Sequence, residues 1–201
     1  MPKLSIIIPV FNQEELVIRA IASCPEFSEI LVIDDCSTDA TVQRVQWFLE
    51  SNPNLNIKLL RNDVNLGVGM TINKGYDIAT GEYIVLLGSD DYLLSERVEQ
   101  VAELANGQDL VYFNLITNNG EIFHVSEKTK MQYCGSVKLM RRDFIGDTRN
   151  PDMRAMEDFH FYNRLLEKNP TELFTDIVAK HYNFPRVGSL SHNVRNGVSN
   201  G

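Results

Sequence analysis

A chain of 201 residues can bury one sizeable hydrophobic core without disulfide bonds or structural metals. Its hydrophobic content of 43% and charged content of 23% are ordinary for a globular domain. The formal net charge of −8 argues against nucleic acid as the main partner, and against adhesion to an anionic membrane through overall charge. No apolar run approaches the roughly 20 residues of a membrane-spanning helix.

The amino terminus and the cysteines point to a cytoplasmic protein. Lys3 is followed directly by a strand pattern, which is not the layout of a signal peptide. Cys24, Cys36 and Cys134 are odd in number and lack metal-ligand spacing, so we expect free thiols in a reducing compartment.

The first half of the chain alternates short apolar strands with amphipathic helices. The predicted strands are Leu4–Pro9, Glu29–Asp35, Ile57–Leu60 and Ile84–Leu87. Pro9 cannot donate to a ladder and should end pairing, and Asn12 is placed to cap the first helix, Gln13–Ser23. The second helix should start at Ser37–Asp39, and the third should follow Gly67 and end near Ala79. This order predicts a parallel βαβαβαβ unit.

After Tyr92 the alternation gives way to antiparallel structure. The predicted elements are a helix at Glu96–Ala105, a strand at Asp109–Leu115, a hairpin turn at Asn118–Gly120, a helix from Glu157 and a strand at Leu173–Phe184. Residues 126–156 are polar and are predicted to form loops over one end of the sheet. Residues 185–201 are rich in Gly, Ser and Asn and are expected to be a flexible tail.

Two of the predicted strands end in paired acids, Asp34-Asp35 and, after Gly88-Ser89, Asp90-Asp91. Open α/β sheets bind ligands beyond the carboxyl ends of their strands. Carboxylates at that place suit Mg²⁺ or Mn²⁺, which in turn holds a diphosphate. The alternative is structural: each pair caps the helix that follows, or makes an Asx turn.

Five blocks of the sequence, taken in order, resemble family 2 glycosyltransferases of the GT-A fold. The blocks are Ser5–Asn12, Val32–Asp39 (with Cys36 where glycine or asparagine is more usual), Asn65–Gly75, Gly81–Asp91 and Glu157-Asp158. The similarity is good over residues 3–106 and thinner over 107–184.

The resemblance implies a Rossmann-like α/β/α sandwich with a mostly parallel central sheet and a smaller antiparallel C-terminal part. Residues 1–184 would form a single domain, with a nucleotide-sugar-binding half at 1–106 and an acceptor-side half at 107–184. The implied activity is metal-dependent, inverting transfer of a sugar from a nucleotide donor, a UDP-sugar, to a glycan, lipid-linked or protein acceptor in polysaccharide biosynthesis. Peripheral membrane association is compatible with such acceptors.

The resemblance also assigns roles to residues. Pro9 and Phe11 would line the slot for the nucleotide base, with Asp35 hydrogen-bonding the base and Asp34 alongside. Asp90 would bind Mn²⁺ or Mg²⁺. Asp158 would be the general base that takes a proton from the acceptor hydroxyl, and Glu157 would orient the acceptor. The remaining donor-site residues implied are Asn12, Gly67, Ser89 and Asp91.

The chain departs from the family pattern at two places. Gly88 stands where the metal motif usually begins with an acid, and Ile72-Asn73 stands where an Arg-Asn pair often supports the diphosphate. Lys74, Arg61 and Arg186 are the candidates for the missing charge. Both departures keep open a sugar-nucleotide-binding module that has lost catalysis.

Two other enzyme classes fit the sequence less well. A sugar-phosphate nucleotidylyltransferase expects a glycine-rich loop after the first strand, and Pro9–Asn12 lacks it. A dinucleotide dehydrogenase is disfavoured for the same reason, because no G-x-G-x-x-G follows that strand.

Overall fold

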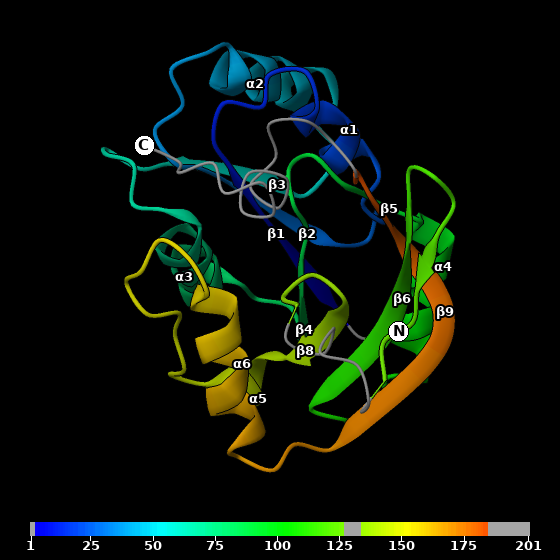
Figure 1. The fold of residues 1–201 in the computed structure, drawn as a ribbon. Helices are drawn as coiled ribbons and strands as arrows, with labels where there is room; N and C mark the ends of the chain where they lie inside the picture. The colour runs from blue at the N-terminus through cyan, green and yellow to red at the C-terminus, as the bar shows by residue number, and fades with distance from the viewer. Residues whose placement is uncertain (1–2, 127–133, 185–201) are drawn as a thin grey trace.

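The computed structural model describes residues 3–126 and 134–184, which form a curved sheet flanked by helices (Figure 1). In chain order the elements are β1 (Leu4–Val10), α1 (Val17–Ala22), β2 (Glu29–Asp34), α2 (Thr41–Ser51), β3 (Ile57–Arg61), α3 (Val68–Ile78), β4 (Tyr83–Leu86), β5 (Tyr92–Leu93), α4 (Ser95–Leu104), β6 (Leu110–Thr117), β7 (Ile122–Phe123), β8 (Lys138–Arg141), α5 (Arg142–Ile145), α6 (Glu157–Leu166) and β9 (Glu172–Tyr182). Within these described ranges the strand order is β3-β2-β1-β4-β8-β6-β9-β5, and β7 pairs with β6.

The first four strands form the parallel unit that the sequence predicts. β1 pairs in parallel with β2 on one side and β4 on the other, and β3 extends the row beyond β2. β1, β2 and β4 are buried on both faces, which explains why their sequences are continuous apolar runs. The carboxyl ends of the four strands open onto the same edge of the sheet, where such folds bind ligands.

Pairing of β1 continues through Pro9 to Val10, so the expectation that Pro9 ends the strand is wrong. The Val10 carbonyl accepts the N–H of Asp35 at 2.8 Å, which shows that Val10 faces β2. Pro9, one residue earlier, faces the β4 side, and the register with β4 stops at Ile7. The N–H that proline lacks is therefore not needed by a neighbouring strand.

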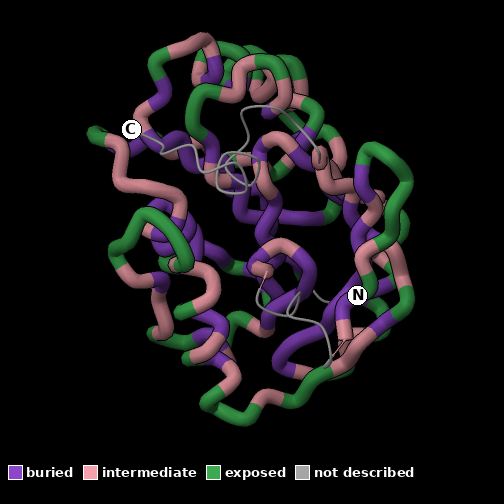
Figure 2. Tube along the Cα trace, viewed as in Figure 1, coloured by how far each residue is buried: buried purple, intermediate pink, exposed green. Residues whose placement is uncertain are grey.

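Helices cover both faces of the sheet, as expected for an α/β/α sandwich. One hydrophobic cluster lies between the sheet and α1, α2 and α4, and a second lies between the sheet and α3, α5 and α6. Alternate residues of β1 divide between them: Ile6 and Ile8 belong to the first cluster and Ile7 to the second. Figure 2 shows the buried residues along the strands and the exposed ones on the outer turns of the helices.

Residues 126–156 contain more than the loops that we predicted. β8 lies inside the sheet between β4 and β6, antiparallel to both, and α5 follows it directly. The strand carries Lys138, which is fully buried with its Nζ 3.4 Å from the Tyr162 ring centroid and 5.0 Å from that of Tyr112. These rings offset part of the cost of burying the amine, whose pKa burial lowers to about 7.

The rest of the second half is a mixed sheet. The hairpin is confirmed, because β7 pairs antiparallel with β6 across the predicted turn. β9 is confirmed as the last strand, but it runs parallel to β6 and antiparallel to the two-residue β5, which the sequence did not indicate. No helix within residues 3–126 and 134–184 is long and apolar enough to cross a membrane. The predicted tail, 185–201, lies outside the described residues.

Two helices begin later than predicted because nearby polar side chains bond elsewhere. Asn12 does not cap α1: its φ is 49° and its Oδ1 accepts the N–H of Thr38 at 2.8 Å. α1 starts at Val17 without a side-chain cap bond. α2 starts at Thr41, whose N–H donates to Asp39 Oδ1 at 3.0 Å, rather than at residues 37–39.

Candidate active site

Asp34 closes β2 and is completely buried. Its Oδ2 accepts the N–H of Ser37 at 3.0 Å and lies 3.3 Å from Nε of Arg61. Arg61 is opposite Asp34 in the register of β2 and β3, so strand pairing itself supplies the counter-charge. Asp34 Oδ1 has no hydrogen-bond partner in the described part of the chain. Asp34 therefore makes the Asx-type contact to Ser37, while the N–H of Thr41, the first residue of α2, donates to Asp39.

Asp35 holds the loop between β3 and α3. Its Oδ1 accepts from Nδ2 of Asn62 and from the N–H of Leu66, and its Oδ2 accepts from the N–H of Gly67, each at 2.8 Å. Gly67 has a φ of 87°, a conformation that favours glycine. A carboxylate offers about four lone-pair sites. Three are taken by the chain, so Asp35 retains one acceptor position for a ligand.

Phe11 and Asn12 stand next to the paired acids. Phe11 follows β1 at the ligand-binding edge and is 44% exposed, and the N–H of Asp35 donates to the residue before it. The backbone N–H of Asn12 donates to Ser37 Oγ at 2.9 Å. Asn12 thus ties the end of β1 to the loop after β2, and Phe11 presents an aromatic face on which a planar base can stack.

The second acidic pair, Asp90 and Asp91, follows Gly88 and Ser89. Ser89 is buried, and neither Ser89 nor Asp90 caps α4, whose start has no side-chain cap bond. A Cβ placed on Gly88 would lie 3.1 Å from both Asp90 Oδ1 and Asp91 Oδ2. The two carboxylates therefore crowd this position, and glycine at 88 gives them room.

Asp91 is already neutralised by a buried lysine. Its Oδ2 lies 2.7 Å from Nζ of Lys180, and the two side chains are 4% and 1% exposed. Lys180 also donates to Ser136 Oγ at 2.6 Å, and the N–H of Asn183 donates to Asp91 Oδ1 at 2.9 Å. Burial alone would lower the pKa of Lys180, but the Asp91 charge outweighs it and the pKa is raised. Asp91 therefore fastens the loop after β4 to β9.

Glu157 and Asp158 form the first turn of α6, where the helix dipole favours negative charge. Asp158 Oδ1 accepts the N–H of Phe159 at 2.7 Å. Glu157 packs against α3: a Cβ on Gly69 would lie 2.9 Å from Glu157 Cγ. Burial raises the pKa of Glu157, and the charge of Asp158 adds to the rise.

These contacts bring Asp35 and Glu157 to the start of α3. Asp35 and Asp90 follow parallel strands on either side of β1, so they share one edge of the sheet. Gly67, which Asp35 binds, is the N-cap of α3, and Glu157 lies against the first turn of that helix. A single cleft that contains Asp35, Asp90 and Asp158 stays a prediction.

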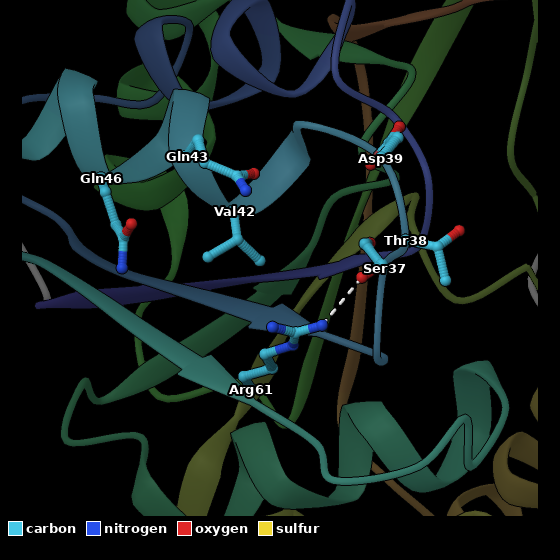
Figure 3. Close-up of a pocket in the computed structure, with 7 residues that line it drawn as sticks. All are labelled: Ser37, Thr38, Asp39, Val42, Gln43, Gln46 and Arg61. Carbon is cyan, nitrogen blue, oxygen red and sulfur yellow. Dashed lines mark hydrogen bonds between the residues drawn. The ribbon is translucent and has the colours of Figure 1, made fainter.

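A hollow of about 540 Å³ lies on the α2 side of this edge (Figure 3). Its lining is mostly polar and consists of Ser37, Thr38, Asp39, Val42, Gln43, Gln46 and Arg61. The Arg61 guanidinium closes one side and donates to the Ser37 carbonyl at 2.9 Å (Figure 3). None of the predicted base-binding or metal-binding residues lines this hollow.

The carboxylates fit a divalent metal only in part. The described residues contain no group of three or more His, Cys, Asp or Glu side chains that could hold a metal ion. Asp91 is paired to Lys180, and Asp90 is the other carboxylate of this motif. Mg²⁺ is commonly held by one or two carboxylates together with substrate phosphates. The residues therefore fit a metal that binds together with a diphosphate.

The positions that often carry an Arg-Asn pair are structural here. Ile72 is part of the core, and the Asn73 amide is used by Asn150. Asn73 Oδ1 accepts from the backbone N–H (2.8 Å) and Nδ2 (3.1 Å) of Asn150, and Asn73 Nδ2 donates to the Asn150 carbonyl at 3.0 Å. Of the cations proposed as replacements, Lys74 is exposed on α3, Arg61 is engaged by Asp34, and Arg186 lies outside the described residues.

Sequence reasoning missed three side chains at this edge. Asn62 follows β3 just as Asp35 follows β2, so its position beyond a strand end could have identified it. Lys180 and Arg154 gave no such signal. Arg154 contacts Asn65, 89 residues away, and no local pattern reports a pairing of that range.

Two solved structures share the fold at low sequence identity. TarS 1–349 of S. aureus in complex with UDP-GlcNAc matches with a TM-score of 0.79 and 24% identity, over 93% of this chain and 60% of that one. The mannosyltransferase PcManGT of Pyrobaculum calidifontis, in complex with GDP-Man and Mn²⁺, matches with a TM-score of 0.76 and 17% identity, over 97% and 61%. This chain spans about three fifths of those solved chains. The likeness establishes the expected GT-A fold.

Sequence comparison gives the family. The chain is 27% identical over 211 residues to an uncharacterized glycosyltransferase of Haemophilus influenzae, a match that covers 95% of this chain and 82% of that protein. The sequence model of Glycosyl transferase family 2 matches residues 5–174. The chain therefore belongs to glycosyltransferase family 2.

Proposed function

We propose that this glycosyltransferase moves a sugar from a UDP-sugar to an acceptor hydroxyl, in a metal-dependent reaction that inverts the anomeric carbon, as a step of polysaccharide biosynthesis. The observation that supports the proposal is that Asp35 and Asp90 follow β2 and β4 on either side of β1, while Glu157 packs against the first turn of α3. Family membership supports the reaction class, and the UDP-GlcNAc complex of the TarS neighbour supports the donor class.

The donor base would stack on Phe11 and Pro9. The free acceptor position of Asp35 suits a ring N–H of the base, because its other lone pairs are taken by the chain. Asn12 and Gly67 hold the loops on either side of this slot, and Asp34 keeps the strand end in place. Ser89 and Asp91 belong to the loop that would face the ribose and diphosphate.

Asp90 would hold Mn²⁺ or Mg²⁺ together with the diphosphate, and the metal would stabilise negative charge on the departing nucleotide. Asp158 takes the proton of the acceptor hydroxyl while that oxygen bonds to the anomeric carbon. The bond from this carbon to the diphosphate oxygen breaks at the same time, and UDP leaves with its electron pair. A single displacement of this kind inverts the configuration. Glu157 orients the acceptor.

The segment before Asp158 favours an acceptor with an apolar part, such as a lipid-linked glycan, over a free glycan. Met153 and Met156 are 37% and 57% exposed on the segment that leads into Asp158. An apolar part of the acceptor can cover such side chains, and a free glycan offers less apolar surface for them. We therefore expect a higher kcat/KM for a lipid-linked glycan than for the same glycan free. Equal kcat/KM values for the lipid-linked and the free glycan would contradict this preference.

The decisive experiment compares Asp158→Asn with Asp152→Asn, which removes an equal charge from the exposed loop before α6. Transfer from a panel of nucleotide sugars is measured alongside UDP binding by calorimetry with Mn²⁺. Loss of a general base costs about 10²–10⁴-fold in rate. Asp158→Asn should therefore lose transfer while it binds UDP normally, and Asp152→Asn should retain both. Unchanged turnover in Asp158→Asn would refute the base assignment.

A second candidate is a sugar-nucleotide-binding module without catalysis. Gly88 and the pairing of Asp91 with Lys180 favour it, because they reduce the carboxylates at the metal site. UDP binding without turnover of any donor, in the wild-type chain with Mn²⁺, would support this module over the enzyme.

We also propose a cytoplasmic location at the membrane surface. All three cysteines are free, which fits a reducing compartment, and fractionation of a tagged chain would test the location.

A further inference from the structure

Arg154 connects two parts of the chain. It belongs to the acceptor-side segment, residues 151–156, and it contacts the donor-side loop, residues 62–67, which joins β3 to α3. Its Nη1 donates to Asn65 Oδ1 at 2.7 Å, and its Nη2 donates to the Asn65 carbonyl at 3.3 Å. The guanidinium also covers Gly67, since a Cβ placed there would lie 3.2 Å from Nη1. Arg154 therefore rests on the same loop that Asp35 holds from the sheet side.

The donor-side loop is a firm anchor. Asn65 Nδ2 donates to the Asp35 carbonyl at 3.3 Å, and the next two backbone N–H groups bind the Asp35 carboxylate. Arg154 thus contacts a loop whose position is fixed by the end of β2. Because Arg154 is hydrogen-bonded to this loop, the position of Arg154 depends on the position of the loop.

The acceptor-side segment has few anchors of its own. It is fixed at one end by the hydrogen bonds between Asn73 and Asn150, and residues 152–156 are all exposed. Among the side chains of residues 151–156, in the described structure, Arg154 is the one that hydrogen-bonds to another segment. Met156 precedes α6 with a φ of 65° and supplies no side-chain cap. Arg154 therefore adds a contact to a segment that is otherwise held at Asn150 and, in the first turn of α6, by the packing of Glu157 against Gly69.

We propose that Arg154 is a positioning residue that sets Glu157 and Asp158 against the donor site by holding Asn65. This inference rests on the proposed function. Arg154 acts by positioning the segment that leads into Glu157 and Asp158, and not by contact with substrate. Loss of the Arg154 side chain should therefore change kcat more than donor binding. A misplacement of about 1 Å can cost about 100-fold in rate. An exposed hydrogen-bonded pair contributes little to stability, so the melting temperature should change by at most about 2 °C.

The test compares Arg154→Met with Arg164→Met, which removes the same charge from an exposed position further along α6. We expect Arg154→Met to lower kcat by tenfold or more, with the donor KM and UDP affinity within about threefold of wild type. Arg154→Lys should recover part of the loss, because an ammonium can keep one of the two bonds. Arg164→Met should match wild type. An unchanged kcat in Arg154→Met, or a tenfold loss of UDP affinity with kcat retained, would overturn the proposal.

A double-mutant cycle and an activity-free measurement complete the test. If the contact carries the effect, Arg154→Met should cost much less in an Asn65→Ala background than in wild type. Fully additive losses would contradict the contact. In the free protein, Arg154→Met should speed hydrogen exchange over residues 152–158 and leave Phe161–Leu166 unchanged. If the wild-type chain transfers no sugar, the proposed function fails, and unaltered exchange in 152–158 would separately reject the role of Arg154.

Discussion

Replacing Lys180 with methionine tests whether Asp91 is a structural ion pair rather than a spare metal ligand. The two side chains are 1% and 4% exposed and their charged atoms lie 2.7 Å apart. Removing the ammonium leaves a carboxylate buried beside Gly88 without its counter-charge. Methionine keeps most of the volume of the lysine stem, so the charge change dominates over the loss of packing.

The expected cost is about 3–5 kcal/mol of unfolding free energy, the usual result of breaking a buried pair from one side. Asp77→Asn is the matched control, because Asp77 pairs with Arg149 at the surface with side chains 59% and 30% exposed. That substitution should cost about 1 kcal/mol or less. The contrast between the two pairs follows from burial alone, since their N–O distances are 2.7 and 2.6 Å.

Equilibrium urea unfolding measures the difference, and a double variant separates charge from volume. Asp91→Leu with Lys180→Met removes both charges, and it should recover about half of the loss or more, because replacing a buried pair by apolar residues is often neutral. The rest reflects the N–H of Asn183 and the hydroxyl of Ser136, which lose a partner. A loss under about 1 kcal/mol in Lys180→Met, or a double variant no more stable than the single, would refute the reasoning.

Three further variants address the acids at the edge of the sheet. In calorimetric titration with Mn²⁺ and UDP, Asp90→Asn should lower metal affinity by about 100-fold or more and Asp91→Asn by much less, and equal losses would contradict the separate roles given to the two acids. Burial raises the pKa of Glu157, so the folded chain keeps a proton that the unfolded chain loses above pH about 4.3. Stability therefore falls as pH rises through the folded pKa, and Glu157→Gln should melt higher than wild type at pH 7 and equally at pH 4. An equal difference at both pH values would reject this assignment.

The first half of the chain could be predicted from the sequence because local signals and long-range structure agree there. Continuous apolar runs indicated strands buried on both faces, and the spacing of the helices indicated parallel crossovers. The paired acids were correctly placed beyond strand ends. Their individual roles could not be predicted, because each role depends on partners that are distant in the sequence. Asp35 binds the N–H groups of residues 66 and 67, and Asp91 pairs with Lys180.

The second half of the chain resisted prediction for a different reason. β8 is a central strand, yet Lys138 breaks its apolar pattern, and a charged residue in a run of four normally indicates a surface. The lysine is accommodated by Tyr112 and Tyr162, which come from β6 and α6. Only the assembled sheet makes that environment. The same limit hid Arg154, whose partner belongs to the other half of the molecule.

The charges of the edge acids give a physical reason for the cation that we propose there. A nucleotide diphosphate is an anion, and the edge of the sheet that would receive it carries Asp34, Asp35, Asp90 and Asp91. Arg61 faces Asp34, Lys180 faces Asp91, and two backbone N–H groups with one side-chain amide bind Asp35. The two basic side chains and these N–H groups already bind the acids, so they offer the diphosphate little net attraction. A divalent cation at Asp90 would reverse the sign of the potential where the phosphates must sit, which is why donor binding is expected to require the metal.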